Sequence, residues 1–178
     1  LTLDNMTAIN VTGGQLLTDS TSSLVLYGGP YALPATVMAL KDLTIDLPSN
    51  GLSLAGPLDI HGTYTQSRGR VLAGALRYSP AATLAYGNAA GDTTSDAEFP
   101  DSLGPRNVTV GTASPLQLHA SRTVPGILTL NGVLATGANT VTIDSAGSVA
   151  RGTGYVRGAL AKRVALGAAT DTFEVGGT

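Results

Sequence analysis

One short acidic segment holds the residue types in this sequence that could most directly do chemistry. Residues 91–101, GDTTSDAEFPD, bring together four carboxylates: Asp92, Asp96, Glu98 and Asp101. Ca²⁺ takes six to eight oxygen ligands, which clustered carboxylates can supply. The spacing lacks the Asp-x-Asp-x-Asp-Gly order of an EF-hand loop. We therefore interpret the segment as a hydrated loop, with a bound Ca²⁺ as the alternative, and expect no cofactor.

The only histidines, His61 and His119, are the candidates for a general base, because imidazole titrates near neutral pH. Both fall beside expected strands at roughly equivalent positions of an internal repeat. The sequence has no Gly-x-Ser-x-Gly elbow, no His-Glu-x-x-His pair and no phosphate-binding glycine loop. We expect both histidines to face solvent in a structural role, and we predict no catalytic residues.

Two groups of basic residues are candidates for an interaction surface. Arg68 and Arg70 flank Gly69, and a second group lies near the end of the chain: Arg157, Lys162 and Arg163. Such groups can bind a carboxylated glycan or a neighbouring subunit. Solvated strand edges are the alternative interpretation.

Composition excludes several classes of protein. Charged residues make up 12% of the 178 residues, and the formal net charge is −2. With both signs scattered, no basic face could neutralise phosphates, so we expect no nucleic-acid partner. The apolar runs are far shorter than the roughly 20 residues that cross a bilayer. Because the chain already starts in a strand-like pattern, LTLDN, we expect an export signal upstream and a secreted or cell-surface location.

Short alternating apolar runs predict strands with one buried face. They are separated by Gly, Pro, Asn, Asp and Ser, which supply turns. The clearest runs are LVLY at 24–27, LTI at 43–45, LSL at 52–54, LDI at 58–60, VTV at 108–110, LQL at 116–118, LTL at 128–130 and VTI at 141–143.

These runs repeat at long range. LVLYG at 24–28 is matched by TLAYG at 83–87, 59 positions on, and LTI at 43–45 is matched by VTV at 108–110, 65 positions on. An insertion at 88–98 explains the jump in spacing. The chain is thus predicted to be one segment of about two and a half repeats: residues 1–23 (partial), 24–82 and 83–164, with 165–178 leading into a following module.

A repeat of about 60 residues is longer than one solenoid coil of roughly 20 to 30 residues, so each repeat would supply two or three coils. The chain has two Phe and no Trp or Cys, unlike an immunoglobulin-type sandwich with its central Trp and Cys pair. We predict an all-β fold, a right-handed parallel β-helix (β-solenoid), with a β-sandwich as the alternative.

The succession FPDSLGPRNVTVG, LQLHASRTVPGILTLNGVLATGANTVTI, SAGSVARGTGYVRGALAKRV and TFEVGGT resembles a repeat of very large secreted surface proteins of Bacteroidetes and related bacteria. Residues 83–176 follow the order of that repeat throughout, and residues 24–80 follow it loosely. The resemblance implies an extracellular β-helical stalk or adhesin. It implies no catalytic residues.

We therefore expect a structural or adhesive repeat module, a segment of a surface stalk or filament that assembles end to end with copies of itself or with adjacent repeats. A glycan-binding surface module, using the 88–98 loop and the region near Arg68, is the first alternative. A polysaccharide-degrading β-helix enzyme is the second, because such enzymes share the solenoid shape, but fold alone is a poor guide to function.

Overall fold

The computed structural model describes residues 1–4, 15–87, 92–112, 115–165 and 167. Within these ranges every regular element is a strand. The described residues therefore include no helix that is long and apolar enough to cross a membrane. The strands are β1 (Thr2–Asp4), β2 (Ser23–Tyr27), β3 (Tyr31–Leu33), β4 (Ala39–Leu40), β5 (Asp42–Leu54), β6 (Leu58–Ile60), β7 (Thr63–Ala73), β8 (Leu76–Tyr78), β9 (Thr83–Tyr86), β10 (Asn107–Val110), β11 (Leu116–Gln117), β12 (Arg122–Val124), β13 (Ile127–Leu130), β14 (Leu134–Ile143), β15 (Ser148–Arg151) and β16 (Val156–Lys162).

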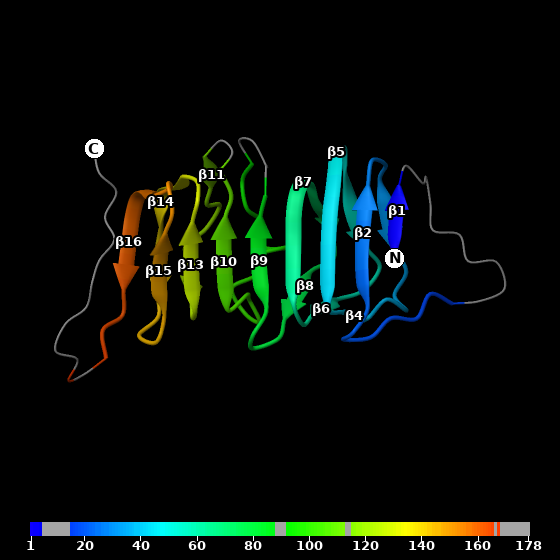
Figure 1. Ribbon diagram of the computed structural model, residues 1–178, viewed down its shortest axis with the longest axis horizontal. Helices are drawn as coiled ribbons and strands as arrows, with labels where there is room; N and C mark the ends of the chain where they lie inside the picture. The colour runs from blue at the N-terminus through cyan, green and yellow to red at the C-terminus, as the bar shows by residue number, and fades with distance from the viewer. Residues whose placement is uncertain (5–14, 88–91, 113–114, 166, 168–178) are drawn as a thin grey trace.

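The strands stack in parallel into a β-solenoid, which confirms the predicted fold class. The largest sheet runs in the order β1-β2-β5-β7-β9-β10-β13-β15, and every pairing in it is parallel. Figure 1 shows these strands side by side along the long axis, with β1 at one end and β15 and β16 at the other. One residue per strand marks the winding, at 19 to 24 residues per turn: Thr2, Val25, Thr44, Thr65, Ala85, Thr109, Thr129 and Ala150.

The strands lie on three faces of the solenoid. The first face is the sheet just described. The second face contains β3, the later halves of β5 and β7, then β11 and the early parts of β14 and β16. The third face contains β4, β6 and β8, then β12 and the later parts of β14 and β16. We call the bend between the first and second faces the first corner, and the bend between the second and third faces the second corner.

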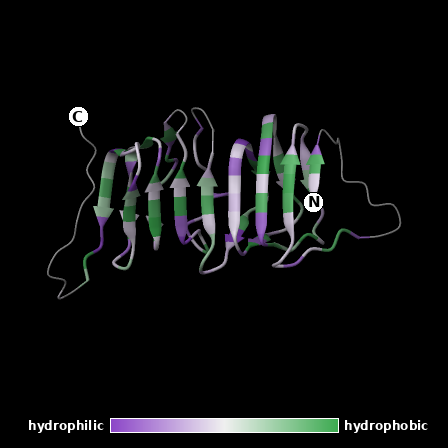
Figure 2. Cartoon of the chain, viewed as in Figure 1, coloured by the Kyte–Doolittle hydropathy of each residue, from purple (hydrophilic) through white to green (hydrophobic). Residues whose placement is uncertain are grey.

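Inward side chains form ladders along the axis, because parallel pairing in register places equivalent residues above one another. One ladder of the first face consists of Leu24, Leu43, Tyr64, Leu84, Val108 and Leu128, and all of these side chains are buried. Figure 2 shows the resulting alternation of hydrophobic and polar residues along the strands. A single continuous core therefore fills the solenoid without a second layer.

The strand register corrects one detail of the repeat alignment. LTI at 43–45 lies in register with VTV at 108–110, as the sequence indicated, and the separation is three turns, where the repeat length had allowed two or three. For LVLYG and TLAYG, however, the residues that stack in the structure are 60 positions apart and not 59, because Leu24 lies three turns from Leu84. A slip of one residue moves every side chain to the opposite face. Tyr27 is consequently 39% exposed, whereas Tyr86 is 3% exposed.

The turn between β9 and β10 is the longest, with 24 residues from Ala85 to Thr109. We call residues 83–106 the long turn. It contains the predicted insertion at 88–98, of which residues 88–91 lie outside the described ranges. On the second face it contributes one isolated parallel bridge, between Thr93 and Gln117. The extra chain length brings polar side chains both onto the surface and into the core.

Candidate functional site

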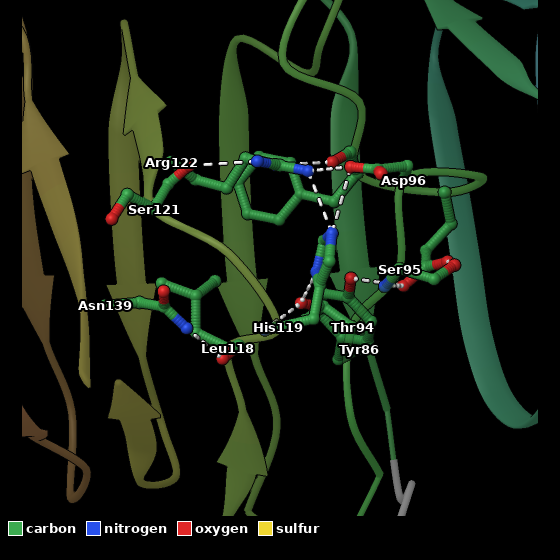
Figure 3. A network of polar contacts seen from close by, with 11 residues as sticks. Tyr86, Thr94, Ser95, Asp96, Leu118, His119, Ser121, Arg122 and Asn139 are labelled. Carbon is green, nitrogen blue, oxygen red and sulfur yellow. Dashed lines mark hydrogen bonds and ion pairs between the residues drawn. The ribbon is translucent and has the colours of Figure 1, made fainter. Parts of the chain in front are cut away.

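The surface half of the candidate site joins the long turn to the segment between β11 and β12. The hydroxyl of Thr94 lies 2.6 Å from Nδ1 of His119 and accepts a hydrogen bond from the His119 backbone N–H at 3.1 Å. Nε2 of His119 lies 3.0 Å from Oδ1 of Asp96. Arg122 also pairs with Oδ1 of Asp96. Figure 3 shows the four side chains converging from two consecutive turns of the solenoid.

Arg122 is the buried charge of this network. Only 5% of its side chain is exposed, because β12 turns it inward in the alternation that also buries Val124. Its guanidinium donates to the carbonyl oxygens of Phe99, at 2.7 Å, and Ser121, at 2.9 Å. It also lies 5.8 Å from the centroid of the Phe99 ring, within the range of a cation–π contact. Every side of this buried charge is therefore matched, as burial of an ion requires.

The ionic part of the network keeps Asp96 charged. The hydrogen bond with His119 and the positive charge of Arg122 outweigh partial burial and hold the pKa of Asp96 below its ordinary value. Nε2 of His119 lies 2.8 Å from Nη2 of Arg122 as well. The ring therefore accepts from the guanidinium when Nε2 is unprotonated, and donates to Asp96 when it is protonated.

The second half of the site lies inside the solenoid, where Glu98 is 1% exposed. Its carboxylate accepts hydrogen bonds from the backbone N–H and hydroxyl of Ser95 and, at 3.1 Å, from the hydroxyl of Tyr86. The hydroxyl of Tyr78 donates to the Glu98 backbone carbonyl at 2.6 Å. Burial raises the pKa of Glu98, although these hydrogen bonds act in the opposite direction.

The core around Glu98 is adapted to a polar group. Tyr64 is fully buried and donates to Oε1 of Gln66 at 3.0 Å. Burial, followed by the nearby charge of Glu98, raises the pKa values of Tyr64 and Tyr86 well above the ordinary value. These phenols therefore remain protonated and can donate hydrogen bonds throughout the physiological range. Gln66 and the three tyrosines replace aliphatic residues in the ladders of the central turns, and Glu98 enters the core beside them from the long turn.

The structure separates the four carboxylates of the predicted Ca²⁺ loop. Glu98 points into the core, Asp96 binds Arg122, and Asp101 is exposed. Asp92 lies at the second face, near Arg70 and the first corner. Among the described residues, no group of three or more acidic, His or Cys side chains is arranged to hold a metal ion.

The two histidines are not equivalent, contrary to the expectation from the repeat. His61 follows β6 on the third face and is exposed. His119 follows β11 on the second face, and its side chain is only 20% exposed because the polar network encloses it. The expected solvent-facing position therefore holds for His61 and fails for His119.

The basic residues lie on separate surfaces. Arg68 forms an ion pair with Asp46 one turn away, with Nη2 to Oδ2 at 3.0 Å. Arg70, two positions on, lines a hollow at the first corner together with Pro30 and Pro48. The second group lies on or beside the last strand: Arg157 and Lys162 in β16, and Arg163, which is 3.5 Å from Asp144.

The surface network anchors the long turn to the segment between β11 and β12. Thr94 has the residue type of a nucleophile, but it is 2% exposed and already bonded to His119. The charge of Asp96 is matched by Arg122. Sequence reasoning missed Thr94 and Arg122 as partners. For Arg122 a signal existed, because the alternation of SRTV places it on the same face as Val124.

Comparison of the chain with protein-family models, with curated proteins and with solved structures finds no match in any of the three. The resemblance to Bacteroidetes surface repeats therefore stays a prediction. Function has to be argued from the geometry of this chain.

Proposed function

We propose that this chain is a non-catalytic structural module of a secreted or cell-surface protein, which extends by stacking end to end on further turns of its own chain or on a second copy. The observation that carries the proposal is that, among the described residues, no further turn is stacked on the apolar ladders at either end. A solenoid buries its core by stacking neighbours, so an uncovered end turn favours a further turn.

The end turns differ from the interior turns in burial, not in residue type. Leu3 continues the ladder of Leu26, which is fully buried, yet Leu3 is only partly buried. At the opposite end, Val149 continues the ladder of Leu128, and Val149 is likewise only partly buried. Leu160 shows the same incomplete burial beyond Val141 on the third face. Covering these side chains with another turn would release about 25 cal/mol per Å² of apolar surface buried.

Charge favours a head-to-tail arrangement. Asp4 and Asp19 are the acidic side chains among residues 1–4 and 15–24, whereas β16 contributes the cations Arg157 and Lys162, next to Arg163, which pairs with Asp144. Opposite charges on the two ends steer association and disfavour contact between like ends. Head-to-tail contacts are heterologous and generate open filaments when the rotation does not close a ring.

The test is the association state of the chain by sedimentation velocity over a range of concentrations, at about 0.05 M and about 0.5 M salt. We expect concentration-dependent association that weakens at high salt. The double variant R157E/K162E should be monomeric, and adding D4K and D19K should restore association. Arg106→Glu, an exposed change on the side of the rod, should have no effect. A native chain that stays monomeric under all these conditions would overturn the proposal.

A further inference from the structure

A hollow on the third face has a different character from the ends of the rod. It has a volume of about 380 Å³ and is lined by residues of β6 and β8, by residues just after these two strands, and by one residue of the long turn: Asp59, His61, Arg77, Tyr78, Ser79, Pro80 and Leu103. We call it the third-face groove. Its volume lies at the lower end of the range of ligand sites, about 300 to 1,000 Å³.

The floor of the third-face groove is a compact array of hydrogen-bonding side chains. Asp59 and Arg77 are direct partners in the β6–β8 ladder, and Nε of Arg77 donates to Oδ1 of Asp59 at 2.7 Å. His61 and Ser79 each follow two positions later on the same outward side, and the hydroxyl of Ser79 donates to the His61 carbonyl at 3.1 Å. Neighbouring strands are about 4.8 Å apart, so the four side chains fit the dimensions of one small ligand.

The lip of the third-face groove is apolar and conformationally costly. Leu103 has a φ of 55° and is the only non-glycine residue with positive φ among those described. For an L-residue this conformation costs roughly 1 to 2 kcal/mol. The Leu103 side chain is nevertheless 63% exposed, beside Pro80, while its carbonyl accepts the Tyr78 N–H at 2.8 Å. A strained backbone that holds an apolar side chain out at the edge of a hollow is typical of a binding site.

We propose that the third-face groove binds a neutral sugar unit of an oligosaccharide or polysaccharide. Asp59 and Arg77 neutralise each other, so the floor has no net charge to attract a strongly charged ligand. A carboxylate acceptor, guanidinium donors, an imidazole and a hydroxyl together match the mixed donors and acceptors of vicinal sugar hydroxyls. Leu103 and Pro80 provide an apolar surface for the C–H face of a pyranose ring.

This site differs from the one that the sequence indicated. The sequence offered glycan binding by the 88–98 loop and the region near Arg68 as an alternative. Arg68 forms an ion pair with Asp46, and residues 88–91 lie outside the described ranges. The third-face groove lies on the side of the solenoid, away from its ends, so sugar binding does not depend on the proposed end-to-end stacking. Each proposal can fail alone.

The test is a titration of the ¹⁵N-labelled chain, followed by amide chemical shifts, with cellohexaose, maltohexaose and mannohexaose and with hexagalacturonate as the charged comparison. We expect at least one neutral hexaose to bind with a Kd of about 1 mM or tighter. Its shifts should centre on the backbone amides of His61, Arg77, Ser79 and Leu103. Absence of shifts with all three neutral sugars, or tighter binding of hexagalacturonate, would overturn the proposal.

Two variants separate binding from folding. Leu103→Gly removes the apolar lip and relieves the backbone strain, so we expect an unchanged or raised thermal midpoint with at least tenfold weaker sugar binding. Arg77→Ala removes donors from the floor and should weaken binding similarly. Arg157→Ala, at the far end of the rod, is the control and should bind as the native chain does. Native affinity in both groove variants would contradict the proposal.

Discussion

The two halves of the solenoid turn their corners by different means. In residues 23–82, β5 and β7 continue around the first corner, and the chain breaks at the second corner. In residues 107–165, the strands end before the first corner, whereas β14 and β16 continue around the second. The change occurs across the long turn. The same solenoid winding therefore allows a continuous strand at either corner, with an interruption between strands at the other.

The first corner of the later half depends on close backbone approach. Gly87, Gly111, Gly132 and Gly154 follow one another along the axis at this corner. A Cβ built on any of the last three would lie well under 3.0 Å from the carbonyl oxygen of the preceding glycine. Only a residue without a side chain fits such a stack. These windings are thus specified by the absence of side chains.

The first corner of the earlier half depends on side chains and irregular pairing. Between β5 and β7 the register shifts near Asp46 and again before Gly51, which marks bulges in the continuous strands. Asp46 and Arg68 pair across this corner on the outside. Bulges let a strand bend without breaking its ladder. The earlier corner therefore carries a charged pair on its outside, although Gly51 within it also lies in close contact with the Arg70 backbone and the Leu72 side chain. The later corner differs in stacking glycine on glycine through successive turns.

Gly132→Ala should have the largest effect on this comparison. The added methyl group would collide with the backbone carbonyl of Gly111, which cannot move without shifting the turn below. We expect a loss of about 4 kcal/mol or more in the free energy of unfolding, in the range reserved for severe steric or core defects. Urea denaturation followed by circular dichroism measures it.

Gly56→Ala, at the second corner of the earlier half between β5 and β6, is the control for an uncrowded glycine in a turn of the chain. Its nearest neighbours to an added Cβ are atoms of Ala35 at 3.7 and 3.8 Å, an ordinary van der Waals contact. The change should alter stability by no more than about 0.5 kcal/mol. Similar losses for both substitutions would show that the glycine stack has no special role.

Strand alternation made the overall architecture predictable, whereas the corners and the site were not. The runs at 43–45 and 108–110 carry enough apolar periodicity to be paired correctly, 65 positions apart, although the number of turns between them stayed at two or three until the structure gave three. The alignment of LVLYG with TLAYG was wrong by one position. Both sets of alternate residues in LVLYG are apolar, so the sequence does not show which set faces inward. Glu98 looked like part of a hydrated loop, and only its tertiary partners, Ser95 and Tyr86, explain its burial.

Glu98→Gln should have an intermediate, pH-dependent effect in the long turn that separates the two halves. Because the pKa of Glu98 is raised in the folded state, the native chain binds this proton more tightly than the unfolded chain. The contribution of Glu98 protonation to the free energy of unfolding is fully present below the unfolded-state pKa. It is lost as pH rises through the folded-state pKa. The glutamine amide keeps an acceptor for Tyr86 without the buried charge. We expect higher stability than the native chain at pH 7 and a flatter stability profile between about pH 4 and 7.

The measurement is the urea midpoint of both proteins across that pH range. Taking the difference between them isolates Glu98 from Asp96, whose lowered pKa acts in the opposite direction. Asp101→Asn changes an exposed carboxylate of the same turn and serves as the control. A variant less stable than the native chain at every pH would show that the charged form of Glu98 is needed in the core.

Arg68→Ala should have the smallest effect, which sharpens the contrast between the two first corners. The guanidinium is exposed, and pairs of this kind contribute little because water and salt screen them. The hydrogen bond from Arg68 nevertheless holds the pKa of Asp46 below its ordinary value. We expect the pKa of Asp46, measured by NMR titration of its carboxyl carbon, to rise in the variant while the urea midpoint hardly moves. A large fall in stability would mean that charge pairing holds the earlier corner as firmly as backbone contact holds the later one.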